Sequence, residues 1–175
     1  MRFLLLLIVI AFATASDPAF TLVVDTTKAG SASNQFVLPL NPSYSASYNC
    51  AVDWGDGTGA QTVINGTTGF PNISHTYASS GVYSVKITEN VVGGFPAIYF
   101  NAGGDRLKLM QIANWGGVTW ATMNSAFYGC SNLRITATDE ATAKTGSVAN
   151  FSYAWYSCIG LTSFPVLNTA AGTDF

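Results

Sequence analysis

Few side chains in this sequence could do chemistry, and most of them lie in or near the stretch VDWGDGT (residues 52–58). Asp53 and Asp56 could act as a general acid and base if a cleft held their carboxyls apart with separated pKa values. Together with backbone carbonyls they could instead bind Ca²⁺, which takes about six to eight oxygen ligands. His75 is the only histidine, so any Ser-His-Asp or Cys-His arrangement would have to use it.

A structural interpretation of the same stretch needs fewer partners. An Asp-Gly pair favours a turn with positive φ, and Trp54 supplies a large side chain that can anchor the turn in a core. We therefore expect a hairpin turn, no catalytic residue, and no metal ion unless calcium binds at Asp53 and Asp56. No cofactor is expected, since Gly103-Gly104 and Gly116-Gly117 are not followed by the Lys-Ser/Thr of a phosphate loop.

Composition and the N-terminus indicate a secreted or cell-surface protein. The charged fraction is 9% and the net charge is -2, which gives no electrostatic basis for binding nucleic acid. Arg2, an apolar run and Ala13-Thr14-Ala15 have the pattern of a signal peptide over residues 1–15. No second apolar run follows, so we expect no transmembrane segment in the mature chain. N-glycosylation sequons stand at Asn65, Asn72 and Asn150.

Residues 16–101 are predicted to form short strands separated by turns. Four segments are rich in β-branched or aromatic residues: Phe20–Thr26, Gln35–Leu40, Tyr48–Trp54 and Val82–Thr88. Polar and apolar residues alternate along the last of them, which predicts one buried and one wet face. Short strands with turn signals at this spacing are typical of a β-sandwich.

Residues 102–175 contain an internal repeat. MNSAFYGCSNL (123–133) and FSYAWYSCIGL (151–161) match position by position at an offset of 28 residues. Repeats with a period of about 20–50 residues are typical of solenoids, in which each unit buries its apolar face against its neighbours. The matched core positions are Phe127, Cys130 and Leu133 in the first unit and Trp155, Cys158 and Leu161 in the second.

Within each unit, apolar residues at spacings of three and four predict a short helix, running in the first unit from Met123 to Cys130. The leucine that follows is expected to open a short strand, as in Leu161–Leu167. The run that begins at Arg106 is expected to supply the strand of an earlier unit.

The three cysteines, Cys50, Cys130 and Cys158, allow two interpretations. Stacked backbones lie about 4.8 Å apart, so Cys130 and Cys158 could form a disulfide, which export permits. They could also be small apolar core residues, and we favour buried thiols, with Cys50 inside the sandwich. The many aromatic side chains are expected to be mostly core, although Trp115 or Trp120 could be exposed and contact a sugar or protein partner.

Two motifs in the first half resemble the paired hallmarks of PKD domains, which are extracellular immunoglobulin-like β-sandwiches. They are VDWGDGT and HTYASSGVYSVKI (75–87). The hallmark positions fall here on Trp54, Gly55, Asp56, Gly57, His75, Tyr77, Gly81, Tyr83 and Val85. The resemblance implies that these residues mainly build the fold, although some members of the family hold calcium.

The second half is similar to the BspA-like leucine-rich-repeat surface proteins. Their Phe-x-x-Cys-x-x-Leu core matches Phe127–Leu133 and, with tryptophan in the first place, Trp155–Leu161. The segment 134–148 is longer than the usual linker, so we expect it to loop out of the stack. Few units are present and none caps the end near Phe175, which predicts a fragment of a longer reading frame or, failing that, self-association through this edge.

The predicted fold class is therefore mainly β: a PKD-type, immunoglobulin-like sandwich over 16–101, followed by a short leucine-rich-repeat solenoid with small helices over 102–175. By its resemblance to adhesion-type proteins, the chain is expected to be a non-enzymatic recognition protein that binds an unknown protein or glycan through its repeats. The alternative is an accessory, binding or spacer, region of a larger secreted hydrolase.

Overall fold

Strands are the main regular structure in the computed structural model, which describes residues 18–175; the predicted signal peptide lies outside this range. The strands are β1 (Phe20–Asp25), β2 (Gln35–Pro39), β3 (Asn49–Asp53), β4 (Ala60–Ile64), β5 (Asn72–Thr76), β6 (Val82–Glu89), β7 (Leu109–Asn114) and β8 (Arg134–Ile135). Two short 3₁₀ helices accompany them, η1 (Pro42–Ser47) and η2 (Glu140–Thr142). Neither of these helices is long and apolar enough to cross a membrane.

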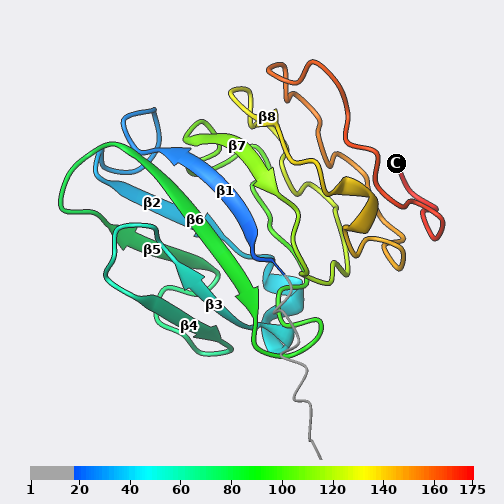
Figure 1. Cartoon of the computed structure of the whole chain (residues 1–175), viewed down its shortest axis with the longest axis horizontal. Helices are drawn as coiled ribbons and strands as arrows, with labels where there is room; N and C mark the ends of the chain where they lie inside the picture. The colour runs from blue at the N-terminus through cyan, green and yellow to red at the C-terminus, as the bar shows by residue number, and fades with distance from the viewer. Residues whose placement is uncertain (1–17) are drawn as a thin grey trace, which may run out of the picture.

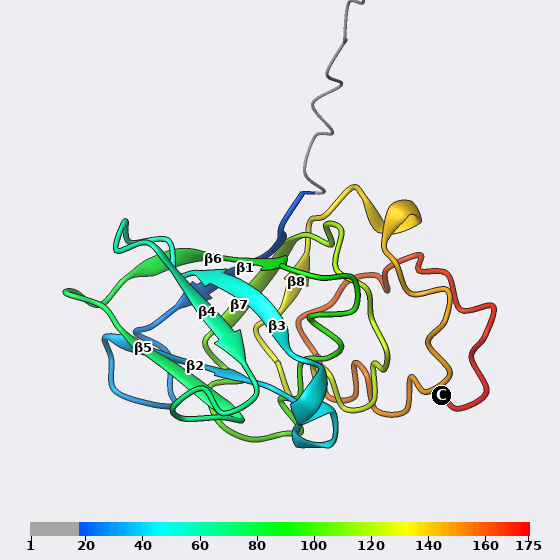
Figure 2. The same ribbon diagram turned by 90° about the horizontal axis from the view of Figure 1, so that it is seen from below.

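The strands form two sheets. The larger has six strands in the order β4-β3-β6-β1-β7-β8, and the smaller pairs β2 with β5. Neighbouring strands are antiparallel except β7 and β8, which are parallel. Figure 2 shows β2 and β5 as a layer on one side of the larger sheet. The predicted fold class is thus confirmed as mainly β with a sandwich-like arrangement of sheets.

Burial alternates along the strands, as the pleat requires. Phe20, Leu22 and Val24 of β1 are fully buried, and so are Val85 and Ile87 of the adjacent β6. The residues between them on β6 are partly or fully exposed, so the two faces predicted for this strand are confirmed. The four strands predicted from sequence are β1, β2, β3 and β6, and no end differs by more than one residue.

The helix predicted from Met123 to Cys130 is wrong, because this segment forms turns. The N–H groups of Ala126 and Cys130 do bond three residues back, which reproduces the apolar spacing of a helix. Ser125 and Gly129, however, have φ angles of 52° and 80°, and left-handed residues interrupt a right-handed helix. The strand predicted at Leu161–Leu167 is also wrong, whereas the expected strand after Leu133 is present as β8.

After β7 the chain forms mainly irregular coils that lie side by side, with the short β8 between two of them (Figure 1). The N–H groups of one coil donate to the carbonyls of the next over 2.8–3.0 Å; the pairs are Met123–Asn150, Ser125–Ser152, Phe127–Ala154 and Gly129–Tyr156. The same coil accepts bonds from the preceding one, from the N–H groups of Phe100, Asn101 and Ala102. The units that match in sequence are therefore neighbours in space.

The predicted boundary after Asn101 does not separate two cores. β7, from the second half, pairs with β1, from the first. At the junction Phe20 stacks on Trp115 with ring centroids 6.0 Å apart and meets Trp120 edge-on at 5.1 Å. Both tryptophans in turn contact Phe127 of the first repeat unit. One buried cluster runs from Phe20 to Cys158, so Trp115 and Trp120 are core residues and not exposed platforms.

Candidate functional site

The predicted hairpin turn connects β3 to β4. Asp53, at the end of β3, accepts a hydrogen bond from the N–H of Gly55 over 2.9 Å. One carboxylate oxygen of Asp56 accepts from both the N–H (3.1 Å) and the hydroxyl (2.6 Å) of Thr58. The other oxygen of Asp56 lies 2.7 Å from Nε2 of His75 on β5. The turn is thereby tied to the opposite sheet.

Aromatic rings enclose the histidine of this pair. Trp54 stacks on His75 with centroids 5.1 Å apart and planes 7° from parallel, and Tyr77 meets His75 edge-on at 4.6 Å. Tyr77 in turn stacks on Tyr83 at 3.7 Å and donates its hydroxyl to the Trp54 carbonyl over 3.1 Å. Burial raises the pKa of Tyr77, which keeps this phenol a neutral donor.

The arrangement is suited to structure more than to acid–base work. Hydrogen bonds from Thr58 and then from His75 lower the pKa of Asp56 to about 2, so the carboxylate stays ionised, whereas a general acid needs a raised pKa. Gly55, which has a φ of 81°, is required beside it, because an added Cβ would collide with the Ser84 carbonyl. Within residues 18–175, no three His, Cys, Asp or Glu side chains are placed to hold a metal ion.

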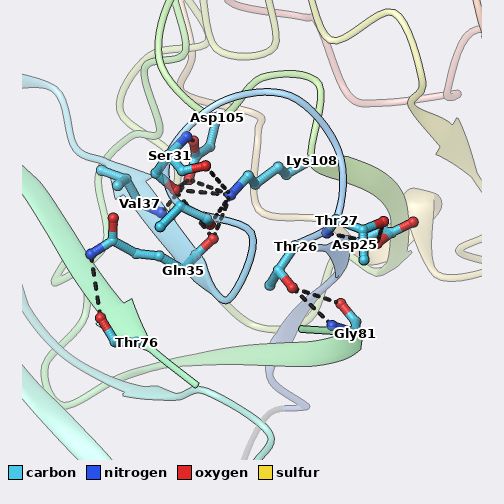
Figure 3. A network of polar contacts seen from close by, with 11 residues as sticks. Asp25, Thr26, Thr27, Ser31, Gln35, Val37, Thr76, Gly81, Asp105 and Lys108 are labelled. Carbon is cyan, nitrogen blue, oxygen red and sulfur yellow. Dashed lines mark hydrogen bonds and ion pairs between the residues drawn. The ribbon is translucent and has the colours of Figure 1, made fainter. Parts of the chain in front are cut away.

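A second polar site, which the sequence did not suggest, joins the two halves (Figure 3). Lys108 is fully buried, and its ammonium donates to the carbonyls of Ser31 (3.0 Å), Ala32 (2.7 Å) and Gln35 (2.7 Å). Asp105 lies 4.0 Å away. Burial lowers the pKa of Lys108, and Asp105 opposes that shift. An enclosed amine with this many acceptors has no path to a substrate, so the cluster acts as a clasp.

Asp105 completes the clasp by accepting bonds from the loop between β1 and β2 and from β2 itself. Its oxygens receive the N–H and the hydroxyl of Ser31 over 2.6 and 2.7 Å, and the N–H of Val37 over 2.7 Å. Glu89 and Asp139 play a comparable part elsewhere, each accepting from two or more backbone N–H groups. In a chain with so few acids, these carboxylates serve mainly to hold loops.

The three cysteines are free thiols and buried, in agreement with the favoured interpretation. Cys50 lies on β3 inside the sandwich. The Sγ of Cys158 donates to the Phe127 carbonyl of the preceding coil over 3.0 Å. Burial raises the pKa of all three thiols, that of Cys158 to about 11, so none is poised as a nucleophile.

The sequon asparagines have different surroundings. Asn65 and Asn72 are exposed, as expected of glycosylation sites. Asn150 is only partly exposed, and its side-chain oxygen accepts from the N–H of Ser152 over 2.9 Å. Asn150 therefore supports the turn of its coil.

Large apolar side chains are exposed on the last coil. Tyr153 and Tyr156 are each 58% exposed, and Phe164 and Phe175 are 71% and 75% exposed. Together with Trp155 they line a shallow hollow of about 680 Å³. The sequence flagged this end as an open edge, although it did not single out the two tyrosines. Aromatic side chains around a hollow are what binding surfaces use.

Comparison of the chain with protein-family models, with curated proteins and with solved structures finds no match.

Proposed function

We propose that this protein is a non-enzymatic recognition protein, secreted or held at a cell surface, that binds a protein or glycan through the aromatic face of its last coil. The observation that carries the proposal is the group of exposed aromatic rings around the hollow, Tyr153, Tyr156, Phe164 and Phe175. Contiguous exposed apolar patches mark interaction sites.

The use of the polar residues supports a binding role. Asp53, Asp56 and His75 are engaged in the hairpin, and Lys108 is enclosed by carbonyls. These four side chains are thus committed to the fold. The function is accordingly assigned to a surface that offers shape, aromatic rings and backbone groups.

The proposal includes the two family resemblances. A PKD-type sandwich is supported by the Trp54–His75–Tyr77 cluster, which joins both hallmark motifs in one packed unit. A BspA-like leucine-rich solenoid is supported by the hydrogen bonds between the units at Phe127 and Ala154 and by the burial of Cys130 and Leu133. In this proposal the sandwich closes one end of the stack, and the aromatic face lies at the other.

The test is binding of the mature chain to a glycan array and to a panel of purified extracellular proteins. We expect at least one saturable partner, whose affinity falls at least tenfold in the variant Tyr156→Ser/Phe164→Ser. Val92→Ser is the matched control, because Val92 is 87% exposed and does not line the hollow. No binding, or an enzymatic turnover that is lost in His75→Ala while the fold survives, would overturn the proposal.

A further inference from the structure

The sequon asparagine Asn72 lies on the outer face of the β2–β5 sheet. Residues directly opposite each other in an antiparallel pair share a face, so Asn72 lies beside Pro39 and Ser74 lies beside Val37. The residues between them on each strand are fully buried on the other face. Asn72 and Ser74, the two residues that define the sequon, are both exposed.

The coil that begins at Tyr99 covers the β2 side of this face. The N–H of Tyr99 donates to the Pro39 carbonyl over 3.0 Å. The N–H of Val37 donates over 2.7 Å to the carboxylate of Asp105 in the same coil (Figure 3). A hollow of about 230 Å³ remains, and Asn72 lines it together with Val37, Pro39 and Tyr99. We refer to it as the Asn72 hollow.

The lining of the Asn72 hollow suits one sugar ring. Val37 and Pro39 supply apolar surface, Tyr99 is a partly exposed aromatic residue, and the exposed Asn101 supplies a polar side chain. Ligand pockets combine apolar walls with a few polar groups in this way, and those for drug-sized molecules measure about 300–1,000 Å³. The smaller volume of the Asn72 hollow has room for a single ring and excludes an oligosaccharide.

We infer that Asn72 is N-glycosylated and that the first N-acetylglucosamine of the glycan lies in the Asn72 hollow against Tyr99. In the transfer, Nδ2 of Asn72 bonds to C1 of a lipid-pyrophosphate-linked oligosaccharide. The bond from C1 to the phosphate oxygen breaks, the lipid pyrophosphate leaves, and one amide proton is released to solvent. The inference rests on the proposed function, because this modification requires export.

The covalent bond explains how so small a hollow could hold a sugar. A free sugar would have to overcome the entropy cost of association, whereas a tethered sugar is held at a high effective concentration. The ring can then cover the apolar surface of Val37, Pro39 and Tyr99. We therefore expect the first sugar to stabilise the fold, and the sugars beyond it to add little.

Asn65 is a matched site that lacks this environment. It is exposed, it belongs to a sequon with Thr67, and it does not line the Asn72 hollow. A glycan at Asn65 should therefore leave stability nearly unchanged. The two sites separate the effect of the hollow from the general effect of carrying a glycan.

The experiment expresses the chain with its predicted signal peptide in a eukaryotic secretory host. All variants carry Ser152→Ala, which removes the sequon of Asn150 and keeps the Asn150 side chain. Asn65→Gln then leaves only Asn72 for glycosylation, and Ser74→Ala leaves only Asn65. Peptide mass spectrometry determines the occupancy of each site, and an endoglycosidase trims each glycan to one sugar.

Thermal unfolding compares each trimmed protein with the same variant made in bacteria without a glycan. One sugar on Asn72 should raise the unfolding midpoint by at least about 2 °C, and one sugar on Asn65 by less than about 1 °C. In Tyr99→Ala the increase from the Asn72 sugar should fall to less than half. Because that comparison is made within one variant, any loss of stability from the substitution itself cancels.

The outcomes separate this inference from the proposed function. If Asn65 is glycosylated and Asn72 is not, or if the Asn72 sugar leaves the midpoint unchanged, this inference alone is wrong. An increase that persists in Tyr99→Ala would also overturn it. A protein with no glycan at either site would contradict export and this inference together. Failure to bind any array partner would contradict the recognition role and leave this inference standing.

Discussion

The coils 123–133 and 151–161 have matching sequences and different surroundings. Phe127 is fully buried, whereas Trp155 in the same place is partly exposed. Leu133 is fully buried and Leu161 is not. The first coil has a neighbour on each side, and the second has only the short segment at Asp174 beyond it. The same residues therefore contribute differently to stability because of what covers them.

The comparison teaches that a stacked unit is stabilised by its neighbours more than by its own sequence. Hydrophobic stabilisation follows the area removed from water, and in the first coil that area is shared with two adjoining units. The last coil leaves Trp155 partly exposed where its predecessor buries Phe127. In the proposed function, this exposed surface is the one that binds.

The largest effect on stability should come from truncating the aromatic side chains at equivalent positions of the two coils, Phe127 and Trp155. Phe127→Ala should lower the free energy of unfolding by about 3–5 kcal/mol, as for other buried aromatic residues. Trp155→Ala should cost less than half of that, because the Trp155 side chain is already partly exposed. Urea unfolding followed by far-UV circular dichroism measures both, with unchanged m-values as the control. Equal losses would break the comparison and show that both coils are equally covered.

A smaller effect is expected at the left-handed turn that both coils share. In Gly129→Ala, the new Cβ would lie 2.9 Å from Cδ of Arg106 and 3.1 Å from Cα of Ala102. Together with the left-handed φ, this should cost about 1–2 kcal/mol or more. Ser157 already holds a φ of 59°, so Ser157→Gly should be neutral or stabilise the fold by up to about 1 kcal/mol. The thermal unfolding midpoint should fall in Gly129→Ala and stay unchanged or rise in Ser157→Gly. A lower midpoint in Ser157→Gly would contradict this reasoning.

Much of the fold could be predicted from local pattern. Alternation along Val82–Thr88 identified β6 and its buried face, and Asp56-Gly57 identified the hairpin that joins β3 to β4. The offset of 28 residues identified two units that are indeed neighbours. These signals depend on residues close in sequence or on exact repetition, so no knowledge of long-range contacts was needed.

The rest depended on contacts that local pattern does not contain. Apolar spacings of three and four fit a helix and a coil of turns equally well, and the left-handed Ser125 decided between them. The clasp of Lys108 joins residues more than 70 positions apart. β7 looked like part of a repeat, and only the three-dimensional structure reveals that it pairs with β1. The openness of the last coil also follows from stacking and not from its sequence.

Acid should lower the free energy of unfolding through the hairpin residue Asp56, by less than the substitutions above. The pKa of Asp56 is lowered to about 2, so its contribution is fully present above pH ~4 and is lost as the pH falls toward ~2. Solvent screening near the surface limits that contribution to about 1 kcal/mol or less. Asp56→Asn should remove this contribution and flatten the stability curve between these pH values. Stability measured by urea titration at each pH tests this, and an unchanged slope in Asp56→Asn would contradict it.

The smallest difference between the two coils can be tested without any substitution, from the reactivity of their cysteines. Burial raises the pKa of Cys158 to about 11 and raises that of the more deeply buried Cys130 as well. A thiol reagent attacks the thiolate, so modification at pH 8 should be slow at both sites and about tenfold faster at pH 9. Cys158, in the last coil, should react before Cys130, whose coil has a neighbour on each side. Mass spectrometry of digested samples gives the order. Identical rates at the two cysteines would mean that both react only through global unfolding, and the last coil would then be as firmly held as its predecessor.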